Sequence, residues 1–163
     1  MNWFPLKNYT HYSLLRGFSK PEELVAKCKD NGYIACGISD YKTISGCVAF
    51  FKACKKAGIK PILGCSFDGF QLFAKNKDGW HDLIEIISSE SNIDKIIKRG
   101  NILQIFDKDY PLEPSSYYVN KEDAKLHRIL LCSEMKTTLP KISKSITKGL
   151  DGDLIVDLNK FPK

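Results

Sequence analysis

The sequence predicts an α/β protein with a mostly parallel sheet. Short apolar runs that suit β-strands alternate with amphipathic segments that suit helices. Polar residues directly follow several of the apolar runs between residues 7 and 67, as they do in a site at the carboxyl ends of strands. No internal repeat, low-complexity segment or linker is present. We therefore expect residues 1–163 to form a single domain.

An N-terminal strand and a capped helix are expected first. Residues 3–9 alternate loosely and contain Pro5, so they suit a strand that enters from an edge of the sheet. Ser19 and Glu22 have the spacing of a capping box, and Pro21 suits the first turn of the helix that follows. The helix should end at Gly32 and bury the apolar residues Leu24, Val25 and Cys28.

Three strands are expected around a second helix. Residues 33–39 form a short apolar run, which predicts a strand buried on both faces. A helix is expected over about residues 46–57, with an inward face formed by Cys47, Phe50, Phe51 and Cys54. Residues 60–67 and 70–74 suit two strands of a hairpin, because the connection at Gly69 is too short for a parallel crossover.

The second half of the chain is expected to add further helices and strands. A helix should carry the apolar residues Trp80, Leu83, Ile84 and Ile87. A short helix capped by Ser91 and a strand over residues 101–106 come next. Asn120 is expected to cap a helix with an inward face formed by Leu126, Ile129 and Leu130. A last short strand is expected over residues 153–158.

Composition excludes several classes of protein. No apolar run is long enough to span a membrane, and the N-terminus lacks the pattern of a signal peptide, so we expect a cytoplasmic protein with no membrane partner. The six cysteines contain no C-x-x-C pair, which argues against a zinc ribbon and favours buried free thiols. Glycine-rich phosphate loops are absent, and we expect no cofactor.

The net charge of +6 weakly favours an acidic partner such as nucleic acid. The charge is spread along the chain except for one tight cluster. That cluster suits either a solvated helix face, which we favour, or a patch that faces phosphate. Its members are Lys52, Lys55, Lys56 and Lys60.

Asp40 and His11 are the best candidates for site residues on the pattern alone. Asp40 directly follows an apolar strand, a position from which side chains often enter a pocket. One carboxylate cannot hold a metal tightly, so capping of the loop that follows it is an equally good interpretation. His11 lies in the first loop, whereas His81 and His127 lie within helices and suit surface or structural roles. No metal site is predicted.

Four stretches of sequence occur in an order that resembles a known family. They read L-K-N-Y-T-H-Y-S-L-L-R-G (residues 6–17), A-C-K-K-A-G-I-K-P-I-L-G-C (53–65), A-K-N-K-D-G-W (74–80) and Y-Y-V-N-K-E-D-A-K-L-H-R-I-L-L-C (117–132). The family is the N-terminal polymerase and histidinol phosphatase (PHP) domain of bacterial DNA polymerase III alpha subunits. The resemblance implies a (β/α) barrel. We expect a reduced, distorted form of it, because the segment between Trp80 and Tyr117 is compressed.

The resemblance also implies where the metal ligands of active family members would fall. The two histidines of the family's H-x-H motif correspond to Lys7 and Tyr9, and the aspartate of L-L-D-G corresponds to Arg16. The histidine after Asp40 corresponds to Tyr41, the glutamate of G-C-E-F to Ser66, and the aspartate and histidine of the N-D-x-H segment to Ser115 and Tyr117. Of the positions compared, Asp40 alone keeps the family's residue. Fixed positive charge where cations bind is unfavourable, so we expect metal-dependent phosphoester hydrolysis to be lost. The former metal pocket would comprise Lys7, Tyr9, Arg16, Asp40, Tyr41, Ser66, Ser115 and Tyr117.

From this resemblance, the main hypothesis is a catalytically inactive, stand-alone PHP-like domain that acts in DNA replication by binding a protein. The implied partner is a DNA polymerase or its proofreading exonuclease, and viral mimicry of a host domain would fit a separate gene of this size. The alternative is a module that binds phosphate or single-stranded nucleic acid through Lys7, Arg16 and His11. A third hypothesis, an enzyme with relocated ligands at His11, Asp40 and Asp68, is the least favoured.

Overall fold

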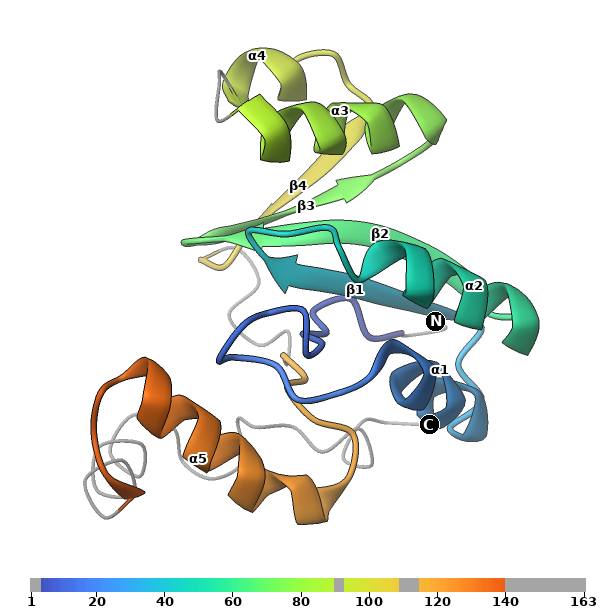
Figure 1. Cartoon of the computed structure of the whole chain (residues 1–163). Helices are drawn as coiled ribbons and strands as arrows, with labels where there is room; N and C mark the ends of the chain where they lie inside the picture. Colours follow the sequence, from blue (N-terminus) through green and yellow to red (C-terminus); the bar gives the residue numbers. More distant parts are fainter. Residues whose placement is uncertain (1–3, 90–92, 109–114, 140–163) are drawn as a thin grey trace.

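The computed structural model describes residues 4–89, 93–108 and 115–139. Four strands and five α-helices occur in these residues, with a short 3₁₀-helix before the last α-helix (Figure 1). The elements are α1 (Pro21–Asp30), β1 (Ala35–Tyr41), α2 (Cys47–Ala57), β2 (Lys60–Phe67), β3 (Phe70–Ala74), α3 (Lys77–Ser89), α4 (Ile93–Ile97), β4 (Ile102–Phe106), the 3₁₀-helix (Lys121–Asp123) and α5 (Ala124–Glu134).

The four strands form one mixed sheet in the order β1-β2-β3-β4. β1 and β2 are parallel, whereas β2 with β3 and β3 with β4 are antiparallel. The predicted hairpin at Gly69 is confirmed, and its glycine has a φ of 86°. The prediction of a mostly parallel sheet is wrong for the described strands, because the hairpin reverses the sheet after its single parallel pair.

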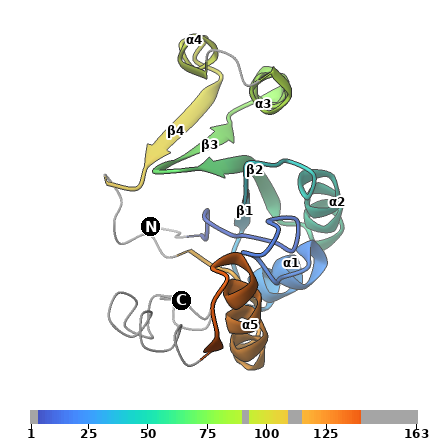
Figure 2. The ribbon, with the colours of Figure 1, turned by 60° about the vertical axis from the view of Figure 1, so that its left-hand side comes forward.

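Two apolar clusters hold the helices against the sheet. The first joins α1, β1 and α2, with Leu24, Ile38 and Phe50 fully buried. The second joins β2 and β3 to α3 and α4, with Leu72 and Leu83 fully buried. In Figures 1 and 2, α1 and α2 accordingly lie by the β1–β2 end of the sheet, and α3 and α4 lie by β3 and β4.

The N-terminal segment lies beside β1 without forming a regular strand. Gly37 N and Ser39 N donate hydrogen bonds to Pro5 O and Asn8 O, at 2.8 and 2.9 Å. On its other side the segment forms an isolated parallel bridge between Asn8 and Ser116. The strand predicted over residues 3–9 is therefore only partly correct, since its described residues have the expected position but an irregular backbone, and residue 3 lies outside the described ranges.

The start of α1 differs from the prediction by one residue. Lys20 is the N-cap, and its backbone N–H donates to the carboxylate of Glu23 at 3.5 Å. The predicted capping box of Ser19 and Glu22 is therefore wrong, because the first helical turn begins one residue later. The predicted end is confirmed, since Gly32 follows the helix with a φ of 77°.

The inward faces of two helices are narrower than predicted, and a third helix turns a different face inward. Phe51 of α2 is 44% exposed and Ile84 of α3 is 38% exposed, because each lies at the margin of its apolar stripe. In α5, Leu126 and Ile129 are exposed, and His127 is the buried residue. The predicted inward face of α5 is therefore wrong, because a hydrogen bond between His127 and the backbone turns a different face inward.

The cysteines agree with the prediction of free thiols. All six are unpaired, and only Cys132 is not fully buried. Burial raises the pKa of the Cys47 and Cys54 thiols to about 12, so both stay protonated and unreactive at neutral pH. No helix in the described ranges is long and apolar enough to cross a membrane. The predicted Ser91 cap and the strand over residues 153–158 lie outside those ranges.

Candidate functional site

Register and alternation place polar side chains in a row across one face of the sheet. Tyr41 of β1 pairs with Ser66 of β2, which pairs with Gln71 of β3. Directly paired residues share a face, while neighbours along a strand point to opposite faces. Tyr41, Ser66 and Gln71 therefore lie on one face, and Asp40 lies on the other. The expected pocket is thus divided by the sheet.

Lys7 is held by an ion pair at this polar face. Its ammonium contacts Asp107, the first residue after β4, and the Lys7 side chain is only 10% exposed. Gln71 Nε2 donates to the same Asp107 oxygen at 2.9 Å. Burial would raise the pKa of Asp107, but the hydrogen bonds from Lys7 and Gln71 outweigh it and lower that pKa. The Lys7 charge is therefore already compensated within the fold.

Tyr9 and Tyr117 fill the adjacent space. Their rings stack with centroids 4.7 Å apart and an interplanar angle of 5°. Both side chains are substantially buried, and burial raises the pKa of each phenol. Both phenols therefore remain neutral at physiological pH. A stacked pair of neutral rings now occupies positions where the family resemblance implies histidine ligands.

Arg16 links the first loop to α5. Its Nε donates to Glu134 at 2.7 Å, and its guanidinium carbon lies 3.5 Å from the centroid of the Tyr41 ring. The Arg16 carbonyl oxygen lies 2.7 Å from His127 Nε2. Ion pairing, cation–π stacking and the backbone contact together fix Arg16 in place. This structural role for His127 agrees with the prediction.

The Tyr41 ring is held from its other end as well. Its hydroxyl donates to Asp68 at 2.7 Å, and Lys42 forms an ion pair with the same carboxylate at 3.1 Å. Hydrogen bonds from Tyr41 and Lys42 lower the pKa of Asp68. Asp68 therefore belongs to an exposed network of hydrogen bonds and ion pairs at the hairpin turn.

Asp40 organises the first loop from the opposite face. It is 1% exposed, and its carboxylate accepts hydrogen bonds from Thr10 N (2.6 Å), Thr10 Oγ1 (2.7 Å) and Ser13 Oγ (2.7 Å). Ser13 Oγ in turn accepts a bond from Tyr41 N at 2.9 Å. Asp40 therefore tethers the loop that precedes it in the chain. The suggestion that it caps the loop after it is wrong.

The structure gathers most residues of the predicted metal pocket, but it places Asp40 on the other face of the sheet. Lys7, Tyr9, Arg16, Tyr41 and Tyr117 all make the contacts described above. Ser66 is fully buried in the same row as Tyr41, and Ser115, which is half-buried, comes just before the Asn8–Ser116 bridge. His11 instead lies 3.3 Å from the Ser19 carbonyl oxygen through its Nδ1.

Two residues of this polar face were missed from the sequence, Gln71 and Asp107. Asp107 lies 100 positions from Lys7 along the chain, so no local pattern could pair them. Gln71 does interrupt the apolar strand F-Q-L-F-A, and a buried glutamine in such a run is a usable signal for a polar contact.

The donor chemistry at this face does not fit a divalent cation. Ammonium and guanidinium groups cannot coordinate a metal, and hydroxyls of neutral tyrosines are poor substitutes for imidazole or carboxylate. Within the part of the chain that the structure describes, no three His, Cys, Asp or Glu side chains are grouped so that they could hold a metal ion. We therefore derive no metal-dependent step from this site.

Comparison with known families identifies the fold. The model of the PHP domain matches residues 5–153, and the chain belongs to this family. The resemblance seen in the sequence is thereby confirmed.

Curated relatives of the chain include DNA polymerase III alpha subunits. It is 35% identical over 91 residues to the DNA polymerase III subunit alpha of Buchnera aphidicola subsp. Schizaphis graminum, covering 49% of this chain and 8% of that protein. The corresponding subunit of Bacillus subtilis is 32% identical over 99 residues, or 54% of this chain and 9% of that protein. The one from Aquifex aeolicus is 50% identical over 56 residues, or 34% and 5%. The chain thus matches less than a tenth of each polymerase subunit.

A solved structure supports the same kind of fold. An amidohydrolase from Chromobacterium violaceum, described with bound sulfate and no metal, has a TM-score of 0.50 at 13% identity. The similarity covers 88% of this chain and 54% of that one. Identity this low bears on the fold only, and it agrees with the mixed α/β architecture.

Proposed function

We propose that this protein is a catalytically inactive PHP-like domain that acts in DNA replication by binding a protein partner. The observation that carries the proposal is the half-buried ion pair between the buried Lys7 side chain and Asp107, at a position where the family resemblance implies a metal-binding histidine. The identity to DNA polymerase III alpha subunits supports replication as the setting. By the same resemblance, the partner is the polymerase or its proofreading exonuclease. The cytoplasmic location expected from the sequence stays a prediction.

The proposal includes the shape of the domain. We infer that the sheet, the N-terminal segment and residues 115–118 form part of a reduced and distorted (β/α) barrel. Its support is the run of hydrogen bonds from β1 to the N-terminal segment and on to Ser116, which continues the sheet past β1. The polar face described above would then be the interior of that barrel.

The contacts favour protein binding over the alternative of phosphate binding. Lys7 and Arg16 are both engaged with carboxylates, Asp107 and Glu134. A phosphate would have to displace these intramolecular partners, at the expense of their ion pairs. His11 lies apart, against the carbonyl oxygen of Ser19.

The proposed absence of catalysis is tested by measuring bound metal and turnover. The purified protein is incubated with manganese and with zinc, desalted and analysed for bound metal, and then assayed with a phosphodiester substrate. We expect less than stoichiometric metal and no turnover above a blank, because the donor set is unsuitable. Stoichiometric metal together with turnover would overturn the proposal and restore the hypothesis of relocated ligands.

The binding half is tested with the replication proteins of the cell in which the gene is expressed. Its DNA polymerase III alpha subunit and its proofreading exonuclease are each titrated with this protein in a calorimeter. We expect saturable binding to one of them. Absence of binding to both would show that the proposed function is wrong. Binding of single-stranded DNA that is lost in Lys7→Ala/Arg16→Ala and weakens with salt would favour the alternative instead.

A further inference from the structure

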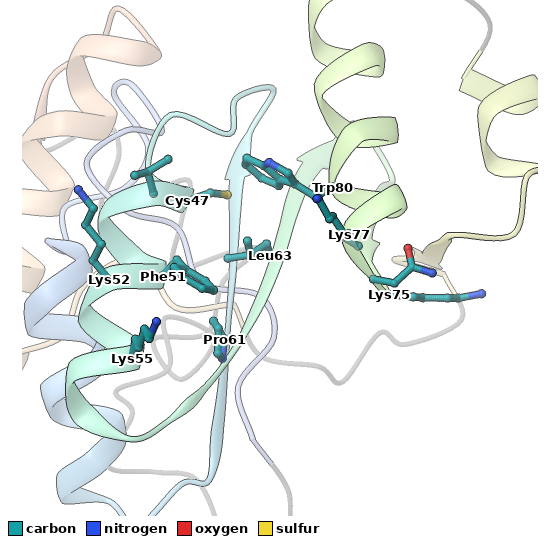
Figure 3. Close-up of a pocket in the computed structure, with 12 residues that line it drawn as sticks. Cys47, Phe51, Lys52, Lys55, Pro61, Leu63, Lys75, Lys77 and Trp80 are labelled. Carbon is teal, nitrogen blue, oxygen red and sulfur yellow. The ribbon is translucent and has the colours of Figure 1, made fainter.

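A groove lies between α2 and the start of α3, away from the polar face. Its volume is about 720 Å³, within the range typical of ligand sites. The floor and walls are largely apolar, and in the view of Figure 3 Leu63 and Pro61 of β2 lie between Phe51 of α2 and Trp80 of α3. Its lining comes from α2, β2, the end of β3 and the start of α3.

Two exposed apolar side chains on α2 are not explained by the fold. Val48 is 56% exposed and Phe51 is 44% exposed, and both line the groove. They lie at i and i+3, on one face of the helix. Phe51 was expected to be in the core, and its exposure at the mouth of an apolar groove is characteristic of a surface that another molecule covers.

The rim of this groove is positively charged. Lys52 and Lys55 come from α2, and Lys75 and Lys77 come from the β3–α3 region (Figure 3). None of the lining residues is acidic. Lys75 donates to the carbonyl oxygen of Gly100 at 3.0 Å, and the ion pairs found among the described residues include none of these lysines. The rim therefore offers uncompensated cations to a ligand.

We propose that this groove binds an acidic segment of a partner protein, with one or two large apolar side chains inserted against Phe51 and Leu63 and flanking carboxylates facing Lys52, Lys55 and Lys77. The inference rests on the proposed protein-binding function and adds a surface and a partner chemistry to it. The apolar floor supplies the anchor pocket, and charge complementarity selects the flanking residues.

A peptide suits this groove better than single-stranded nucleic acid. Nucleic-acid grooves present a series of exposed aromatic faces on which successive bases stack. Here Phe51 is the one well-exposed ring of the lining, since Trp80 is half-buried and packs against both apolar clusters. An apolar side chain of a peptide can use the floor directly.

The test uses Trp80 as an internal reporter. The sequence has two tryptophans, so Trp3→Phe leaves Trp80 as the single one, inside the groove. The probe is a short synthetic peptide with a Leu and a Phe one helical turn apart, flanked by Asp and Glu. The control ligands are the same peptide with Asn and Gln in place of Asp and Glu, the same peptide with Ala in place of Leu and Phe, and oligothymidine. We expect the acidic apolar peptide to change Trp80 emission saturably and to bind about tenfold more tightly than either altered peptide.

Two variants locate the binding surface. Phe51→Ala, at an exposed position, should weaken peptide binding about tenfold, and Lys52→Glu/Lys55→Glu should weaken it similarly while reducing its salt dependence. The matched control is Lys29→Glu/Lys98→Glu, which makes the same charge change at exposed positions outside the groove lining. Once the general effect of net charge is allowed for, this control should bind the peptide with an affinity within about twofold of that of the parent. If Phe51→Ala does not fold, Phe51→Leu and the lysine variant still test the surface.

The outcomes separate this inference from the proposed function. No Trp80 response to the acidic peptide, equal affinity for the amide peptide, or tighter binding of oligothymidine would overturn the groove assignment. If the replication proteins bind the parent and the groove variants equally well, the groove assignment is wrong and the proposed function stands. If the peptide binds as expected but neither replication protein does, the proposed function is wrong and the groove remains a peptide site.

Discussion

Asp40, the one compared position that keeps the family's residue, anchors the first loop. Its carboxylate is almost fully buried and accepts three hydrogen bonds from Thr10 and Ser13. Burial raises the pKa of Asp40 above its ordinary value of 3.8, although those hydrogen bonds act in the opposite direction. The residue is therefore ionised less readily in the folded protein than in the unfolded chain.

Substitution of Asp40 should separate its hydrogen-bonding role from its charge. In Asp40→Asn the amide oxygen still accepts bonds, and the amide N–H can donate to the Thr10 hydroxyl, so we expect little loss of stability at neutral pH. Asp40→Ala leaves the buried Thr10 N–H without an acceptor and should lower the free energy of unfolding by about 1–3 kcal/mol. Urea denaturation followed by circular dichroism measures both.

The raised pKa of Asp40 also predicts a pH dependence. The folded carboxyl binds its proton more tightly than the unfolded one, so its contribution to stability is complete below the unfolded pKa of 3.8 and is lost as pH rises through the folded pKa. Other acidic groups titrate in the same range, so the informative quantity is the difference between parent and Asp40→Asn. The parent should lose stability relative to the variant as pH rises through that window. A difference independent of pH would contradict the raised pKa.

At the level of residues, the Lys7 site shows which features could be predicted from the sequence and which could not. The loss of metal-binding residue types at positions 7, 9 and 41 was apparent from the sequence and its resemblance. The partner of Lys7 was not apparent from the sequence, because Asp107 comes close to Lys7 only through the pairing of β4 with β3. Similarly, the exposure of Phe51 depends on where α3 and Trp80 lie, and the helical spacing of α2 contains no such information.

At the level of elements, local patterns were reliable where local chemistry decides. The capping glycine Gly32, the α2 helix and the β2–β3 hairpin all followed from sequence. The direction of β4 and the inward face of α5 did not follow. Each of these depends on a long-range contact, the pairing of β3 with β4 in one case and the approach of His127 to the first loop in the other.

Close approach of the N-terminal segment to β1 makes Gly37 a sensitive position. A Cβ atom at Gly37 would lie 2.5 Å from Leu6 O and 2.8 Å from Leu6 Cα, both backbone atoms with little freedom to move. We expect Gly37→Ala to displace the segment from β1 and to lower the free energy of unfolding by about 1–3 kcal/mol. Denaturant titration gives the stability, and faster amide hydrogen exchange at Gly37 and Ser39 would report loss of their bonds to the segment.

A glycine with free space provides the control. Gly69 has a φ of 86°, and a Cβ atom added there would meet no other atom within 4 Å, so Gly69→Asn causes no steric conflict. Asparagine tolerates the left-handed conformation, and the expected loss is about 1 kcal/mol or less. Equal effects of Gly37→Ala and Gly69→Asn on exchange at β1 would show that close packing against Leu6 does not hold the segment.

At the scale of the whole molecule, family membership is accompanied by a polar face whose donor groups do not suit a divalent cation. The chain belongs to the PHP family and matches DNA polymerase III alpha subunits along about half its length. Its polar face, however, is held together by ion pairs and stacked rings between side chains of the chain itself. These intramolecular contacts connect the N-terminal segment with β3 and the first loop with α5.

Because Lys7, Tyr9 and Arg16 contact other side chains of the protein, we predict that folding is independent of metal. Where a metal stabilises a folded state, its removal lowers the melting temperature by mass action. We expect the melting temperature of this protein in a chelator to stay within about 1 °C of its value in manganese or zinc, because Lys7, Tyr9 and Arg16 have protein partners in the fold. A PHP phosphoesterase that retains its histidine ligands is the control and should melt at a lower temperature after the same treatment. A sharp fall in the melting temperature of this protein on chelation, reversed by one metal, would show that a cation holds the domain together and that the inactive assignment is wrong.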